Sequence, residues 1–131
     1  MNTIALITKT PIISQIFTLV CKKLNLNLTV KEENDIKEHY DIIVLDEEFI
    51  NEHFNMIRQY ATKVGSITNE ELSFEKSNDF TIPRPFLPMQ LQTKLQETLN
   101  DIYQEKLEEV ASYSIVKDQG QGQSWLCLLL C

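Results

Sequence analysis

Short apolar runs recur along the chain and are separated by amphipathic stretches. Residues 4–7 and 42–45 are uninterrupted apolar runs, which are typical of strands covered on both faces. Leu26, Leu28 and Val30 alternate with polar residues, as expected of a half-exposed edge strand. The pattern predicts five strands in all, at residues 4–7, 26–30, 42–45, 64–68 and 80–82.

Apolar residues at helical spacing connect these strands. Thr10 offers an N-cap hydroxyl and Pro11 suits the first helical position, so a helix is predicted from here. Its apolar stripe consists of Ile13, Phe17, Val20 and Leu24. A helical turn or two is expected within residues 35–39, and a long helix from Pro88 to about Val110. Another helix is expected after Asp46, with an apolar face made of Ile50, Phe54, Ile57 and Ala61.

Strands that alternate with helices predict an α/β fold. We expect a doubly wound, five-stranded parallel sheet with helices on both faces. Residues 69–79, between the fourth and fifth strands, suit only a loop or a short helix.

Composition and charge narrow the classes of function. The length of 131 residues fits one domain, and 43% hydrophobic residues suffice for a core. A net charge of −7 with scattered lysines and arginines argues against direct nucleic-acid binding. Neither a signal peptide nor a membrane-spanning run is expected. Cys21, Cys127 and Cys131 have no metal-ligand or paired spacing, which favours a reducing, cytoplasmic location.

The candidate chemistry lies where the predicted strands end, because ligands of such sheets gather at the carboxyl ends of the strands. Thr8 and Lys9 follow the first strand, Asp46 the third, Thr68 the fourth and Arg84 the fifth. Asp46 has two interpretations. As a nucleophile it could accept a phosphoryl group, a reaction that normally needs magnesium. As a helix N-cap it would only accept a main-chain hydrogen bond.

No other motif supports an enzyme. His39 and His53 lie on different elements without Cys or Asp partners, so no metal site is predicted. No serine or cysteine has a nucleophile-elbow context, and the three glycines form no phosphate-binding loop. A flavodoxin-like enzyme would need a bound cofactor, and no loop suits one.

From residue 3 to about residue 110, the chain resembles the receiver domain of two-component response regulators. The resemblance is carried by the strand at residues 40–46, by Arg84-Pro85-Phe86 after the fifth strand, and by the helix that begins near Leu87-Pro88. It implies the strand order 2-1-3-4-5 and makes Asp46 the phospho-acceptor position. It also implies that Thr68 senses the phosphate, that Arg84 replaces the lysine that contacts it, and that the Arg84-Pro85 bond is cis.

Several positions depart from the receiver pattern. The acidic pair that holds magnesium after the first strand is replaced by Thr8 and Lys9. Lys9 would repel a divalent cation and could pair with Asp46, although it could instead point to solvent. Thr81 stands where the family has an aromatic switch residue, and residues 69–79 are too short for the usual fourth helix, which is therefore reduced or missing.

These departures lead to a hypothesis of internal neutralisation. Lys9 and Arg84 would flank Asp46 and take the place of metal and phosphate, so no Mg²⁺ or other cofactor is expected. Glu47 and Glu48 are interpreted as acids beside a helix N-terminus, because adjacent residues do not all face one site.

The predicted function is that of an atypical, pseudo-receiver module in signal transduction and transcriptional regulation, without metal-dependent phosphorylation. It would act through a protein partner, either a regulator or a kinase, or as a homodimer, and no enzymatic activity is expected. The alternative is a phosphorylatable receiver that accepts a phosphoryl group on Asp46 from a histidine kinase.

The domain prediction places a receiver-like domain at residues 1–110 and a linker or tail at residues 111–131. Residues 112–116 could open a strand of a further domain, so DNA would be contacted only through a missing C-terminal output domain. The last residues, from 119 on, include the apolar run 125–131. They are interpreted as a truncated or frame-shifted end of a longer regulator, or alternatively as a segment packed against the domain.

Overall fold

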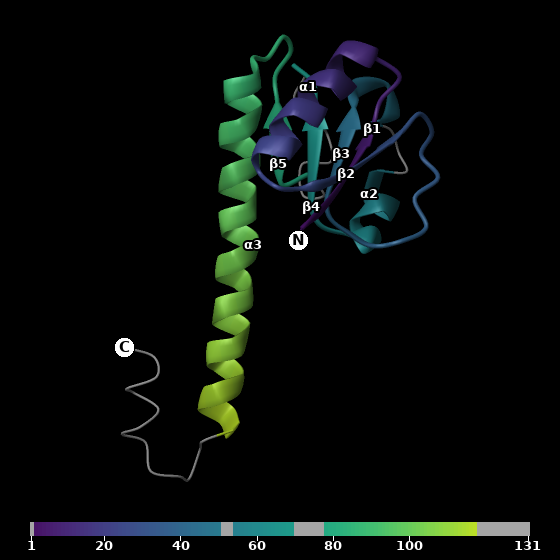
Figure 1. Ribbon diagram of the computed structural model, residues 1–131. Helices are drawn as coiled ribbons and strands as arrows, with labels where there is room; N and C mark the ends of the chain where they lie inside the picture. Colours follow the sequence, from purple (N-terminus) through teal and green to yellow (C-terminus); the bar gives the residue numbers. More distant parts are fainter. Residues whose placement is uncertain (1, 51–53, 70–77, 118–131) are drawn as a thin grey trace. The chain divides into compact units, whose positions relative to one another are not determined.

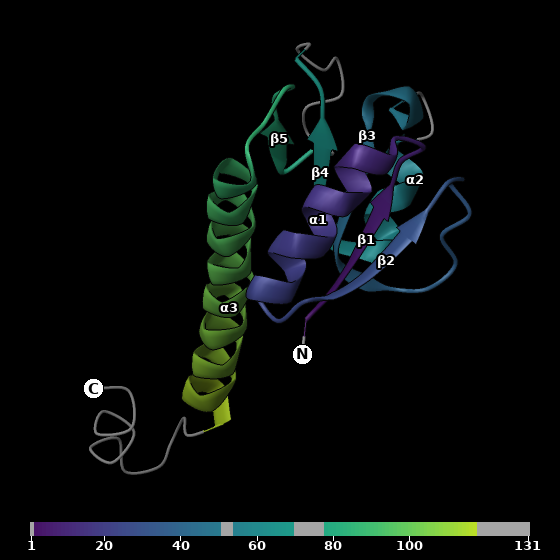
Figure 2. The same ribbon diagram turned by 45° about the horizontal axis from the view of Figure 1, so that its top comes forward.

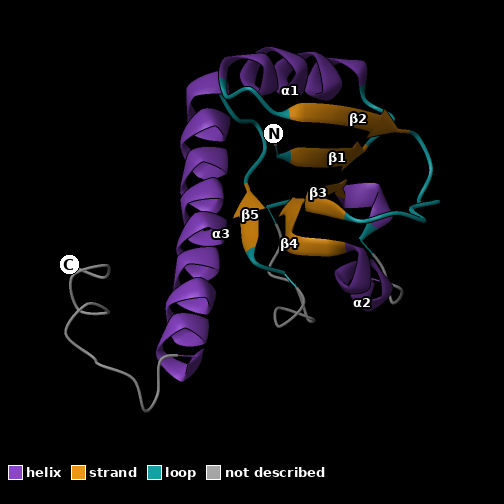
Figure 3. Ribbon diagram, turned by 60° about the horizontal axis from the view of Figure 1, so that its bottom comes forward, coloured by secondary structure: helices purple, strands orange, loops and turns teal. Residues whose placement is uncertain are grey.

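All five strands of the computed structural model lie in one parallel sheet, within residues 3–82 (Figure 1). The structure describes residues 2–50, 54–69 and 78–117, with residues 54–55 and 110–117 described by their backbone alone. The strand order is β2-β1-β3-β4-β5, which Figure 3 shows across the sheet. The predicted fold class and strand order are confirmed. The strands are β1 (Thr3–Ile7), β2 (Asn27–Lys31), β3 (Tyr40–Asp46), β4 (Ala61–Ile67) and β5 (Phe80–Ile82).

The two uninterrupted apolar runs become two interior strands of the sheet. Ile4–Ile7 in β1 and Ile42–Leu45 in β3 are fully buried, and Ile4 pairs with Ile42 in register. Side chains alternate between the two faces of a strand. Ala5, Ile7, Ile43 and Leu45 face one cluster, which also contains Ile36, Ile57 and Val64. The intervening residues of β1 and β3 therefore face the opposite side, where α1 lies (Figure 2).

Helix α1 (Pro11–Lys23) follows the predicted pattern. Thr10 is its N-cap residue in an extended conformation, with Pro11 in the first helical position, but the predicted cap hydrogen bond from the Thr10 hydroxyl is not made. The stripe residues Ile13, Phe17 and Val20 are buried. The chain then turns at Asn25, whose φ of 57° lies in the left-handed region that asparagine tolerates.

The segment between β3 and β4 is less helical than predicted. It contains two 3₁₀ turns, η1 (Glu47–Phe49) and η2 (Arg58–Tyr60), and the short helix α2 (Phe54–Ile57). The predicted helix with Ala61 on its face is wrong, because Ala61 pairs with Tyr40 and begins β4. Sheet pairing there outweighs the helical spacing of the apolar residues.

The link between β2 and β3 contains no helical turn, so the turn predicted within residues 35–39 is wrong. Its one buried apolar side chain, Ile36, packs into the cluster under the sheet. Burial of that single side chain needs no regular helix. The predicted reduced fourth helix falls on residues 70–77, outside the described residues.

Helix α3 runs from Pro88 to Lys117 and is longer than predicted. The strand predicted at residues 112–116 is wrong, since these residues continue the helix. No glycine or proline interrupts the chain between Met89 and Lys117, and local helical preference is therefore not opposed. Contacts group Met1–Thr98 into one compact unit and Leu99–Cys131 into another. The division at residue 110 stays a prediction, and the tail from residue 118 on lies outside the described residues.

Among the helices that the structure describes, none combines the length and the apolar character needed to cross a membrane.

Candidate functional site

The buried carboxylate of Asp46 marks the candidate site at the carboxyl end of β3. Its side chain is only 2% exposed. Asp46 pairs in register with Ile67 of β4, and the end of β1 leads directly into Thr8 on its other side. The central position of β3 in the sheet thus places a carboxylate in a site walled by both neighbouring strands. Such a group is stable only when it is paired or hydrogen-bonded.

Three residues satisfy the Asp46 carboxylate. The hydroxyl of Thr8 donates to Oδ2 at 2.6 Å, and the main-chain N–H of Glu47 donates to Oδ1 at 2.8 Å. The Nη2 atom of Arg84 lies 3.0 Å from Oδ1 and 3.2 Å from Oδ2. The contact with Glu47 makes Asp46 the N-cap of η1, which is the second of its two interpretations. The phospho-acceptor role stays a prediction.

Arg84 is held in place through its main chain as well as its side chain. The side-chain amide of Asn69 accepts from the Arg84 N–H at 2.8 Å and donates to the Arg84 carbonyl at 2.6 Å. The Arg84-Pro85 bond is cis, as predicted. Asn69 directly follows β4 and Thr68, so it ties the exit of β5 to the exit of β4. Sequence reasoning missed this role, because nothing local distinguishes Asn69 from an ordinary loop residue.

The Lys9 side chain lies against Phe49 and not against Asp46. Its ammonium stands 5.9 Å from the centre of the Phe49 ring, a cation–π distance, and its side chain is exposed. Of the two cations predicted to flank Asp46, both in the described part of the chain, the structure brings only Arg84 into contact with the carboxylate. The neutralising charge therefore comes from the β5 side of the site.

Thr68 and Glu47 form a second pair of contacts beside Asp46. The Thr68 hydroxyl donates to Oε1 of Glu47 at 3.1 Å, and Nη1 of Arg84 lies 3.9 Å from Oε2. The interpretation of Glu47 as a first-turn acid outside the site is thus incomplete. Asp46 is extended while Glu47 opens a 3₁₀ turn, so the alternation of side chains along the strand ends between them. Both carboxylates can therefore face the same site.

The remaining predicted positions lie apart. Thr81 is exposed, and its hydroxyl oxygen accepts a hydrogen bond from the Asn78 amide at 2.9 Å. His39 is exposed, and His53 lies outside the described residues. Neither Thr81 nor His39 contributes to the arrangement around Asp46 as the structure describes it.

The residues around Asp46 do not fit a magnesium ion. Mg²⁺ prefers six oxygen ligands in a near-octahedral arrangement, usually with carboxylates among them. Here the oxygens of Asp46 already accept from a hydroxyl, a main-chain N–H and a guanidinium. Thr8 and Lys9 supply no carboxylate, and the described residues contain no group of three or more His, Cys, Asp and Glu that could hold a metal. Among the described residues, Arg84 is the cation that contacts the Asp46 carboxylate.

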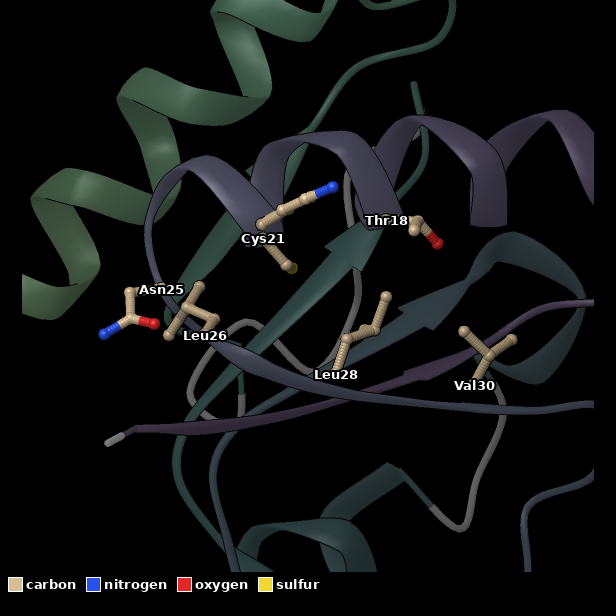
Figure 4. A pocket seen from close by; sticks show the side chains of 7 residues that line it. Thr18, Cys21, Asn25, Leu26, Leu28 and Val30 are labelled. Carbon is tan, nitrogen blue, oxygen red and sulfur yellow. The ribbon is translucent and has the colours of Figure 1, made fainter.

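Hollows lie along α1, and two of them are distinguished by their lining residues. The first, of about 560 Å³, opens beside Arg84. The second, of about 420 Å³, lies between α1 and the edge strand β2 (Figure 4), and is lined by Thr18, Cys21, Lys22, Asn25, Leu26, Leu28 and Val30. Burial raises the pKa of the Cys21 thiol to about 11. Cys21 therefore stays protonated and unreactive near neutral pH.

Comparison with solved structures identifies the fold as that of response-regulator receiver domains. The receiver domain of a sensor histidine kinase from Pseudomonas aeruginosa, with magnesium in its active site cleft, is 16% identical, with a TM-score of 0.56. An orphan response regulator of H. pylori is 17% identical and a response regulator from Thermotoga maritima 15%, each with a TM-score of 0.63. The matches cover 75–76% of this chain and 96–98% of the other chains. No protein-family model and no curated protein matches the sequence.

Proposed function

We propose that this chain is an atypical receiver module that acts in signal transduction through protein partners, without metal-dependent phosphorylation of Asp46. The observation that carries the proposal is the pairing of Arg84 with a carboxylate that is 2% exposed. This cation, on the chain itself, supplies the neutralising charge that a receiver of the usual kind takes from magnesium.

The chemistry of phosphoryl transfer supports the proposal. A carboxylate that attacks a phosphoryl donor needs an accessible oxygen and a cation that neutralises the charge on the transferred group. Oδ2 of Asp46 accepts a short hydrogen bond from Thr8, and both oxygens lie against Arg84. An incoming phosphoryl group would have to displace these contacts without the compensating attraction of a metal ion.

A second candidate function is that of a receiver that still accepts a phosphoryl group on Asp46 from a histidine kinase. Asp46, Thr68 and Arg84 lie at the ends of β3, β4 and β5, the positions that the receiver resemblance assigns to phosphate chemistry. In this case Arg84 would move from the carboxylate to the phosphoryl group. The fold likeness supports both candidates equally.

Exposure of the purified chain to acetyl phosphate and MgCl₂, followed by intact-mass measurement at neutral pH, separates the two functions. We expect no phosphoryl adduct. A receiver domain shown beforehand to react with acetyl phosphate serves as the positive control for the reagent. A phosphoryl adduct that disappears in Asp46→Asn would overturn the proposal in favour of the second candidate.

The partners proposed are proteins: a regulator, a kinase or a second copy of the chain. A net charge of −7 disfavours direct contact with nucleic acid. Any role in transcription would therefore require a separate DNA-binding domain. If Asp46 is not phosphorylated, Asp46→Asn should leave partner binding in a pull-down assay unchanged, whereas a phosphorylation-dependent partner would be lost.

A further inference from the structure

We propose that the second compact unit of the chain joins two copies of the protein through an exposed stripe of α3, made of Leu99, Tyr103 and Leu107. The inference rests on the proposed function, because it names which of the proposed protein partners this surface fits, a second copy of the chain. The stripe follows Thr98, the residue at which the compact unit that contains the sheet ends.

The stripe is a second apolar face of the helix. Leu99, Tyr103 and Leu107 follow one another at intervals of four residues, which places them on one side of α3. Leu99 is half-buried, whereas Tyr103 is 61% and Leu107 45% exposed. Leu95 and Ile102, seven residues apart, belong to an adjacent face that is already buried. The stripe is therefore apolar surface that the burial of this adjacent face leaves open.

The second unit offers the stripe no element of its own to pack against. As far as the structure describes this unit, it consists of residues 99–117 of α3, a single helix. The apolar face of a helix contributes to stability when it packs against another element, and helix formation in water is otherwise marginal. Large apolar side chains that stay exposed in one row are typical of a contact site.

The distribution of charge around the helix favours a second copy as the partner. Asp101, Glu105 and Glu109 each follow a stripe residue by two positions, which is about 200° around the helix, and all three are exposed. These acids, with a net charge of −7 on the chain, would repel nucleic acid or an anionic membrane and would draw a basic partner to the face opposite the stripe. A second copy presents the same uncharged stripe, so the two stripes can pack while both acidic faces stay in solvent.

The test is analytical ultracentrifugation of the full chain over a range of concentrations, without Mg²⁺ or acetyl phosphate. We expect a reversible equilibrium between monomer and dimer. Leu107→Lys should raise the dimer Kd at least about tenfold, because one substitution alters both copies in a two-fold symmetric contact. Leu19→Lys is the matched control, since it makes the same exchange at a leucine of α1 that is 63% exposed and belongs to the other unit. Its Kd should stay within about twofold of that of the unchanged chain.

A chain that stays monomeric up to the highest soluble concentration would overturn the inference, as would equal values of Kd in Leu107→Lys and Leu19→Lys. Association that grows past two copies would also contradict it, because a two-fold contact closes at the dimer. If Leu107→Lys does not fold, as judged by circular dichroism, Tyr103→Lys replaces it with the same expected result. Phosphorylation of Asp46 by acetyl phosphate would refute the proposed function instead. That measurement reports on a residue outside the stripe, so the two failures are distinguishable.

Discussion

Removal of Arg84 is the most direct test of the role assigned to it. In Arg84→Gln, Asp46 keeps its bonds from Thr8 and Glu47 but loses its only cationic contact among the described residues. Breaking a fully buried ion pair from one side costs about 3–5 kcal/mol, whereas exposed pairs contribute about 0–1 kcal/mol. Asp46 is 2% and Arg84 34% exposed, so the pair lies between these cases. We expect a loss of roughly 1.5–3 kcal/mol, the range for hydrogen bonds to charged groups.

Urea unfolding measures this loss directly. For a small domain, the expected loss lowers the urea midpoint by about 1 M at an unchanged m-value. Lys94→Gln is the control, because Lys94 pairs with Glu97 at 3.6 Å on the surface, with side-chain exposures of 40% and 62%. Its loss should remain within about 0.5 kcal/mol. Asp46→Asn should cost less than Arg84→Gln, since it removes the buried charge together with the pair.

Equal losses in Arg84→Gln and Lys94→Gln would refute the reasoning. The Arg84–Asp46 ion pair would then contribute no more to stability than an exposed surface pair. The charge of Asp46 would have to be neutralised by another group. A larger loss in Asp46→Asn than in Arg84→Gln would likewise show that the carboxylate is not the group that depends on its partner.

Three further predictions concern the residues around this site and the core. In Gly65→Ala, the new Cβ would lie 2.2 Å from ring atoms of Phe80, which pairs with Gly65 in register. We expect the free energy of unfolding in urea to fall by about 1–3 kcal/mol. A second substitution, Phe80→Leu, should partly restore it, because it removes the ring. The pKa of Cys21 is raised from 9.0 to about 11, so the folded chain keeps a proton that the unfolded chain releases. The contribution of the Cys21 thiol to the free energy of unfolding is complete below pH 9 and is lost as the pH rises to about 11. Between pH 9 and 11, Cys21→Ala should therefore lose about 2–3 kcal/mol less free energy of unfolding than the unchanged chain does, as measured by urea unfolding at both pH values. Asn69→Ala removes two hydrogen bonds to the main chain of Arg84 and should lower the free energy of unfolding by about 1 kcal/mol. Asn69→Asp should have an intermediate effect, because it keeps the acceptor oxygen. An unchanged urea midpoint in both variants would contradict the role of Asn69.

The sequence pattern predicts the sheet well because its strongest signals are local. Continuous apolar runs identify β1 and β3 as inner strands, and alternation identifies β2 as an edge, since each pattern reflects how many faces are buried. Pro11 places the start of α1 for the same reason, because the fixed φ of proline is a property of that residue alone. These features need no knowledge of distant contacts.

The candidate site is predicted only in part, because its contacts join residues far apart in the chain. Strand ends place Asp46, Thr68 and Arg84 together, as the topology requires. The orientation of Glu47 depends on a 3₁₀ turn where a longer helix was predicted, and the role of Asn69 depends on a contact with a residue beyond β5. Neither has a local signature in the sequence.

The two faces of the sheet have unequal cover in the part that the structure describes. Helix α1 lies over one face, whereas the cluster on the other is closed by a non-helical link and short turns, through Ile36, Phe49, Ile50, Ile57 and Tyr60. Short turns bury little apolar surface per residue, so they open at a lower free energy than the sheet does. Main-chain amides of η1 and α2 should therefore exchange with solvent through local opening, while those of β1 and β3 exchange only when the whole unit unfolds. Because Glu47 belongs to η1 and Asp46 to β3, local opening would move the Glu47 carboxylate away from Arg84 while Asp46 and the central strands keep their places.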